Sequence, residues 1–197
     1  MLYKLTRISN WEEEIKRSRF VVYAGPVDTT EAALKFIEKY SVAEATHNCW
    51  AYSIGDEYRF NDDGEPGGTA GRPILQAIHG QQIDYAVVLV IRWFGGIKLG
   101  TGGLVRAYGG AAAQCLRVAD KRKLVPMVTI SCHCPFSYIS IIQARMDEYD
   151  ISINAEQFNA DGVIWELAVP EANLEDYINA FTNITRGQGV INDEPAV

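Results

Sequence analysis

The chain has 197 residues, of which 48% are hydrophobic and 22% charged, and a formal net charge of −7. These proportions are typical of a globular protein and exclude a disordered or fibrous chain. The longest apolar run, residues 85–91, is too short to span a bilayer, and residues 1–20 contain no apolar run of signal-peptide length. We therefore expect a cytoplasmic protein with no membrane partner.

Charge is distributed unevenly along the chain. Residues 1–123 carry 16 Lys and Arg against 14 Asp and Glu, whereas residues 124–197 carry 2 against 11. This change, next to Pro126, predicts an N-terminal domain at 1–123 and a C-terminal domain at 127–197. The four cysteines show no disulfide framework, so we expect them to be free thiols.

The first domain is expected to mix strands and helices. A strand at 19–25 precedes D-T-T-E from Asp28, a capping-box pattern that starts a helix ending near Tyr40. The elements expected after it are strands at 48–54 and 57–61, a loop at 61–73, a helix at 73–80, a buried strand at 85–94 and a helix at 101–119. The last helix is expected to bury one face, formed by Leu104, Ala107, Tyr108, Ala111, Cys115 and Val118.

The second domain shows a different order of elements. We expect a strand at 128–134, a helix at 136–149, strands at 151–158 and 162–169, a helix at 171–183 and a short strand near 188–192. This βαββαβ order is that of the ferredoxin-like split βαβ arrangement. The chain as a whole is therefore predicted to belong to the α+β class.

The densest functional pattern is RWFGGIKLGTGGLVRAYGG at residues 92–110. A buried strand enters glycines and then a helix start, where backbone amides and partial positive charge favour an anion. Cations and glycines of this stretch are the predicted binding residues: Arg92, Gly95, Gly96, Lys98, Gly102, Gly103 and Arg106. The alternative is that the glycines only solve turn and packing problems. The stretch is neither a Walker A motif nor a clean G-x-G-x-x-G.

A second loop, NDDGEPGGTAGRP at residues 61–73, contains three acidic residues. Asp62, Asp63 and Glu65 are candidate oxygen ligands for a divalent metal, but we favour the alternative that they cap backbone amides or pair with arginines. His47 and Cys49 share a strand face, yet a buried, inert thiol is the commoner fate of such a cysteine. No metal site, cofactor or catalytic residue is therefore assigned.

Three motifs together resemble one family. ATHNCWAY, NDDGEPGGTAGRPIL and RWFGGIKLGTGGLVRAYGGA are similar to the IMPACT family, in its bacterial YigZ-like branch. Gly67 and Trp93 replace the serine and tyrosine usual there. The resemblance implies an N-terminal domain like domain IV of elongation factor G and like the second domain of a ribosomal small-subunit protein. It also implies a C-terminal domain like domain V of that factor. The implied function is regulation or support of translation, with RNA or a ribosome-associated protein as the partner.

Two functional hypotheses follow for the glycine-rich stretch. In the first, a non-enzymatic protein binds RNA phosphates, because residues 92–123 carry seven Lys and Arg against one acid. The predicted contacts are the cations named above together with Arg72, and Trp93 is a candidate for stacking on a base. In the second, an enzyme binds a nucleotide or another small phosphate ligand through the glycine-rich loop, with the Asp62, Asp63 and Glu65 loop beside it.

Overall fold

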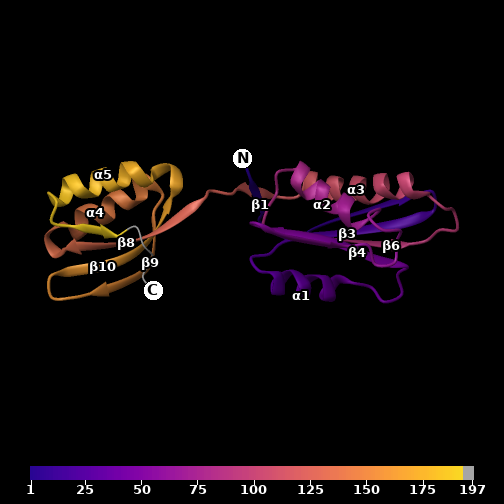
Figure 1. Cartoon of the computed structure of the whole chain (residues 1–197), viewed down its shortest axis with the longest axis horizontal. Coiled ribbons are helices and arrows are strands. Elements are labelled where there is room, and N and C mark those ends of the chain that lie inside the picture. Colours follow the sequence, from indigo (N-terminus) through magenta and orange to yellow (C-terminus); the bar gives the residue numbers. More distant parts are fainter. Residues whose placement is uncertain (193–197) are drawn as a thin grey trace. The chain divides into compact units, whose positions relative to one another are not determined.

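The structure is a computed structural model that describes residues 1–192 (Figure 1). The last five residues of the predicted domain at 127–197 lie outside the described residues. Contacts divide the chain into two compact units, Met1–Leu124 and Val125–Val197. Each unit combines helices with antiparallel strands, as in the α+β class. No helix in residues 1–192 is long and apolar enough to cross a membrane.

A five-stranded antiparallel sheet forms the centre of the first unit. Its strands, in spatial order, are β2 (Ser9–Ile15), β3 (Ser18–Pro26), β6 (Ala86–Trp93), β4 (His47–Ile54) and β5 (Glu57–Asn61). Helices α2 (Gly71–Gly80) and α3 (Thr101–Val118) lie on one face of the sheet, and α1 (Thr30–Tyr40) lies on the other (Figure 1). Because both faces are covered, the central strand β6 is apolar on both sides, as its sequence predicts.

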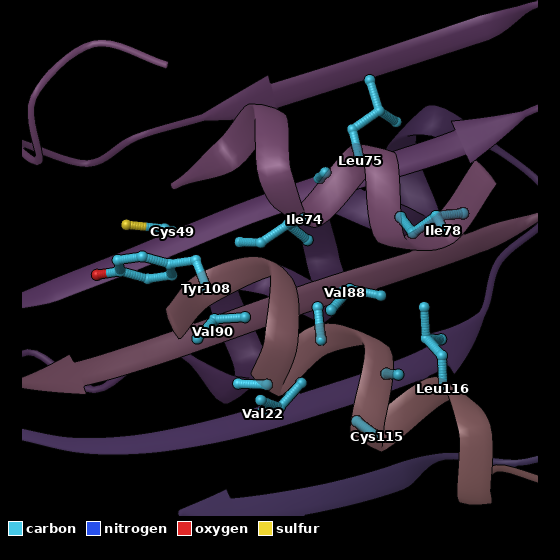
Figure 2. Packing of buried hydrophobic residues seen from close by; sticks show 14 of the residues in the cluster. Val22, Cys49, Ile74, Leu75, Ile78, Val88, Val90, Tyr108, Cys115 and Leu116 are labelled. Atoms are coloured by element: carbon cyan, nitrogen blue, oxygen red, sulfur yellow. The ribbon is translucent and has the colours of Figure 1, made fainter. Parts of the chain in front are cut away.

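The main core of this unit lies between the sheet and the two helices α2 and α3. Figure 2 shows their side chains meeting those of β3, β4 and β6. Tyr108 is fully buried there and makes an edge-to-face contact with Phe20, with ring centroids 5.3 Å apart. The predicted buried face of α3 is confirmed except at Val118, which is 60% exposed. Val118 is the last helical residue, and the buried position beyond it is Ala119.

Helix α1 begins one residue later than the capping pattern predicts. Thr29, not Asp28, is the N-cap, and its hydroxyl accepts a hydrogen bond from the Ala32 amide at 3.1 Å. Asp28 forms an ion pair with Lys4 instead. The predicted end of the helix at Tyr40 is confirmed.

The sequence did not predict three strands of the first unit. β1 (Tyr3–Leu5) and β7 (Lys121–Lys123) form a small antiparallel sheet that joins the two ends of the unit. β2 is an edge strand that carries three consecutive glutamates, while Trp11 and Ile15 pack against the core. Charged side chains are common on edge strands, which they protect from pairing with other chains.

The second unit has the element order that its sequence predicts. Its elements are β8 (Met127–Pro135), α4 (Ile139–Met146), β9 (Ser152–Phe158), β10 (Gly162–Pro170), α5 (Leu174–Thr185) and β11 (Val190–Asn192). The strands pair antiparallel in the order β11–β8–β10–β9. Trp165, Tyr177 and Phe181 form the centre of its core, together with the buried thiols of Cys132 and Cys134.

Candidate functional site

A cavity of about 390 Å³ lies at one end of the sheet in the first unit. It is bounded by the start of β4, the 62–70 loop, the end of β6, the glycine-rich loop and the first turn of α3. Its lining residues are Thr46, His47, Glu65, Pro66, Arg92, Phe94, Lys98, Leu99, Gly100, Thr101 and Leu104. The walls are mostly apolar, whereas the inner end carries charged side chains.

A buried ion pair forms the floor of this cavity. The Glu65 and Arg92 side chains are only 4% and 6% exposed, and Arg92 Nη1 donates to Glu65 Oε1 at 2.6 Å. The Tyr108 hydroxyl donates to the same oxygen at 2.7 Å. Burial raises the pKa of Tyr108, which keeps the phenol protonated and able to donate. Arg92 is thus held by Glu65 and, through Nη2, by the Ser18 hydroxyl at 3.2 Å.

His47 stands beside the ion pair, and its two ring nitrogens have different neighbours. Its Nδ1 lies 2.7 Å from the carbonyl oxygen of Asp63, an acceptor, so Nδ1 carries a proton. Nε2 is therefore the nitrogen that faces Glu65, 3.7 Å from Oε1. The ring adds a polar group to the cavity floor and holds the neighbouring loop through Asp63.

The acidic loop uses one carboxylate to fix its own backbone and the start of α2, and a second to attach the loop to β4. The Asp62 carboxylate accepts from the amides of Gly68, Ala70 and Gly71, at 2.8, 2.9 and 2.8 Å. Asp63 Oδ2 accepts from the amide of Asn48. Residues 1–192 contain no group of three or more His, Cys, Asp or Glu that is arranged to hold a metal ion. These contacts match the interpretation of the loop as a turn that caps backbone amides.

Cys49 shares a strand face with His47, but its thiol is not poised for nucleophilic chemistry. It donates to the carbonyl oxygen of Asp62 at 3.0 Å, and burial raises its pKa to about 12. A thiol with that pKa is almost entirely protonated near neutral pH. Cys49 therefore belongs to the packed interior next to Tyr108 (Figure 2).

The glycines of the loop before α3 serve several purposes. A Cβ at Gly95 would lie 1.8 Å from the carbonyl oxygen of Arg17, so the backbone of the β2–β3 turn requires glycine there. Gly96 and Gly100 have left-handed φ values of 87° and 72°. Gly102 has no such constraint and meets only the Arg106 side chain within 4 Å. A Cβ added at Gly103 would lie 3.1 Å from the Cβ of Leu99, which is a close contact.

Four exposed cations gather around the start of α3, and we call them the basic surface: Lys16, Arg17, Lys98 and Arg106. Lys98 lines the cavity, while Lys16 and Arg106 line an adjoining hollow of about 200 Å³. Leu99 lines both depressions and connects them. Within residues 1–192, none of the four cations forms an ion pair.

The β2–β3 turn presents two of these cations in a strained conformation. Ile15 pairs with Ser18, so Lys16 and Arg17 form a two-residue hairpin turn, with left-handed φ values of 48° and 67°. Such a turn favours Asn-Gly, because a side chain in the left-handed region costs about 1–2 kcal/mol per residue. The other two-residue hairpin of the unit, β4–β5, has glycine at its left-handed position, Gly55. The sequence analysis did not select Lys16 or Arg17, although a Lys-Arg pair between two strands was visible.

Two predicted binding residues lie away from the cavity. Arg72 is exposed on α2 beside a separate hollow of about 480 Å³, which is also lined by Tyr58 and His79. Trp93 packs on the α1 side of the sheet, opposite to Arg92, with the Arg19 guanidinium 4.9 Å from its ring centroid. Of the other predicted residues, Arg92 and Lys98 line the cavity, Gly103 and Arg106 line the adjoining hollow, and Gly95, Gly96 and Gly102 line neither.

The residues that build this site fall within a known protein family. The model of the Impact N-terminal domain matches residues 16–116, and a domain of unknown function, DUF1949, matches residues 132–188. The chain belongs to the IMPACT family. The first match includes the whole cavity and the basic surface.

Relatives in the IMPACT family resemble this chain over most of its length. A Thermus thermophilus member is 42% identical over 175 residues, which cover 88% of this chain and 97% of that protein. YigZ of Escherichia coli is 35% identical, with 89% of each chain covered. The rat protein IMPACT is 37% identical over 93 residues, which are 43% of this chain but 29% of that protein. A crystal structure of a hypothetical protein, 31% identical, superposes with a TM-score of 0.73 over 100% of this chain and 98% of that one.

Proposed function

We propose that this IMPACT-family protein supports or regulates translation by binding RNA, whose phosphates contact the basic surface of its first unit. The observation that carries the proposal is the β2–β3 turn. Lys16 and Arg17 occupy positions that favour Asn-Gly. Lys16 lines the hollow beside the uncapped first turn of α3, and the backbone of Arg17 lies against Gly95. Strain of this kind persists where it serves a purpose, and here it places two cations beside Lys98 and Arg106.

The geometry favours binding over the alternative of a nucleotide-dependent enzyme. Asp62 accepts hydrogen bonds from three backbone amides and Asp63 from one, so both carboxylates already serve to hold the backbone around the loop. The four exposed cations offer point charges along a surface, which suits a polyanion better than a single phosphate. Phosphate contacts of this kind give affinity that depends steeply on salt and little on sequence.

The fold also supports the link to translation. We infer that the first unit resembles domain IV of elongation factor G and that the second resembles domain V, which is ferredoxin-like. The element order β8–α4–β9–β10–α5–β11 and the strand order β11–β8–β10–β9 support the ferredoxin-like assignment. Such a pair of domains would be suited to a ribosome-associated partner as well as to RNA.

The proposal is tested by fluorescence anisotropy with a labelled single-stranded RNA of about 12 nucleotides, between about 50 and 200 mM salt. Wild type is expected to bind with an affinity that falls with salt. A variant with all four cations of the basic surface changed to Ala is expected to reduce the slope of log K against log salt by about 0.7 per lost phosphate contact.

The matched control is Lys35→Ala with Lys39→Ala, which removes two exposed cations from α1 on the other face of the sheet. This control is expected to bind like wild type. Absence of binding at low salt refutes the proposal. A loss of affinity per removed cation that is equal in the control and in the four-cation variant also refutes it, because the effect would then reflect net charge and not a surface.

A further inference from the structure

The cavity beside the basic surface has a chemistry of its own. We propose that it accepts a nucleobase that carries an exocyclic amino group, namely adenine, cytosine or guanine, with the attached phosphate at the rim near Lys98. The inference rests on the proposed function where the base belongs to an RNA strand, and it extends to a free nucleotide of the same chemistry.

The floor offers a hydrogen-bond acceptor to the ligand. All the side-chain contacts of Glu65 converge on Oε1, which accepts from Arg92 and Tyr108 and faces His47. Within residues 1–192, Oε2 accepts no hydrogen bond, although the side chain is only 4% exposed. Oε2 is therefore free to accept a hydrogen bond from a ligand, and a hydrogen bond to a charged acceptor is stronger than one between neutral groups.

The charge of the lining excludes a cationic donor. Arg92 neutralises Glu65 at the floor, and Lys98 adds a positive charge at the mouth. An ammonium or guanidinium group would meet a site whose formal charge is already positive. The donor that fits is a neutral N–H, such as an amino group. Uracil presents one ring N–H between two carbonyl oxygens, and a carboxylate repels those oxygens.

The walls of the cavity suit a flat, apolar body. They are formed by Phe94, Leu99, Leu104 and Pro66. Phe94 is 46% exposed, and the Arg92 guanidinium lies 5.5 Å from its ring centroid. The cation fixes the inner end of the ring by a cation–π contact and leaves the remaining surface open for stacking on a base.

The rim favours an anion. Lys98 and Thr101 line it, and α3 starts at Gly100 with no side chain that caps its free amides. Beyond Leu99 lie Lys16 and Arg106, in the adjoining hollow. A nucleotide whose base occupies the cavity can therefore continue its phosphate backbone toward the basic surface. A neutral donor, a flat apolar body and an anionic outer end together define an amino-bearing nucleotide.

The test compares binding of three RNA homopolymers of about 12 nucleotides, oligo(A), oligo(C) and oligo(U), at one low salt concentration. Wild type is expected to bind oligo(A) and oligo(C) at least about tenfold more tightly than oligo(U), because only they donate an amino group to a charged acceptor. AMP, CMP, GMP and UMP form the second arm, and UMP is expected to bind most weakly.

Two variants assign the preference to the cavity. Glu65→Gln keeps the volume of the side chain and turns part of the acceptor into a donor, so it is expected to abolish the preference for amino-bearing bases. Phe94→Ala is expected to weaken binding of all three oligomers by at least about fivefold, through the loss of stacking. Phe136→Ala is the matched control, since Phe136 is similarly exposed, at 52%, and lies in the second unit. This control is expected to bind like wild type.

The outcomes separate the two proposals. Salt-dependent binding that is equal for all three oligomers refutes the nucleobase site and leaves the RNA surface standing. If no oligomer binds but AMP and CMP bind more tightly than UMP, the RNA surface is refuted and the nucleobase site serves a free nucleotide. If neither oligomers nor nucleotides bind, both proposals are wrong.

Discussion

Exchanging the β2–β3 turn pair for the residues that its backbone favours, Lys16→Asn with Arg17→Gly, is expected to stabilise the first unit and weaken RNA binding together. Each side chain now held in the left-handed region costs about 1–2 kcal/mol. Glycine at position 17 increases the backbone entropy of the unfolded chain, which reduces the gain in stability by about 0.5–1 kcal/mol. With two such side chains, the expected net increase in the free energy of unfolding is therefore about 1–3.5 kcal/mol.

Both effects are measurable on one preparation. Urea unfolding followed by tryptophan fluorescence reports mainly on the first unit, which contains three of the four tryptophans. The loss of two phosphate contacts is expected to lower the salt slope of RNA binding by about 1.4. The control variant Lys35→Ala with Lys39→Ala is expected to change neither the salt slope nor the midpoint by a comparable amount.

The two readouts test separate steps of the reasoning about the turn. An unchanged or lowered urea midpoint would show that Lys16 and Arg17 carry no relievable strain. A salt slope equal to that of wild type would show that their side chains do not contact phosphates. Increased stability together with a reduced slope is the only result that agrees with both steps.

Three further predictions concern stability and are measured by urea unfolding. Gly95→Ala is expected to lower the free energy of unfolding by about 3 kcal/mol, because the added Cβ meets the backbone of Arg17. Gly110→Ala, which adds a Cβ in open space within α3, is expected to raise it by about 1 kcal/mol. Equal effects of the two substitutions would contradict the packing argument. Arg92→Ala leaves the Glu65 charge buried and unpaired and is expected to cost about 3–5 kcal/mol; a loss within about 0.5 kcal/mol would show that the pair is not buried in solution. Burial raises the pKa of Cys115 from 9.0 to about 12, so the unfolded chain loses this proton above about pH 9 while the folded unit keeps it. The free energy of unfolding is thus expected to fall with pH above 9, by up to about 1.4 kcal/mol per pH unit for this thiol, and Cys115→Ala should reduce that slope; an identical slope in the variant would refute the assignment.

Local patterns in the sequence predict most of the fold. The apolar run at residues 85–91 is recognisable as β6 because both faces of that strand are covered. β2 is hidden because its three consecutive glutamates interrupt the apolar alternation, although Trp11 and Ile15, on the same face as Glu13, reach the core from an edge position. The N-cap of α1 shifts by one residue because Asp28 is engaged by Lys4, which precedes it by 24 positions in the chain.

The candidate site is less accessible to sequence reasoning because its parts come from distant segments. Glycine and charge spacing point to the loop before α3 and to the first turns of that helix, where Lys98 and Arg106 lie. Nothing local shows that Glu65 pairs with Arg92, a contact that depends on how the 62–70 loop folds over the end of β6. The turn cations reach α3 only through the pairing of β3 with β6, which places the backbone of Arg17 against the glycine-rich loop.

The pairing of β1 with β7 has a consequence for how the first unit could be handled as a separate piece. Residues 3–5 and 121–123 are adjacent strands, so the chain enters and leaves this unit at neighbouring points. Units with adjacent ends tolerate circular permutation and insertion into a loop of a host protein. The first unit, with its cavity and basic surface, is therefore suited to insertion into a host loop, because its adjacent ends would leave the two sides of that loop close together.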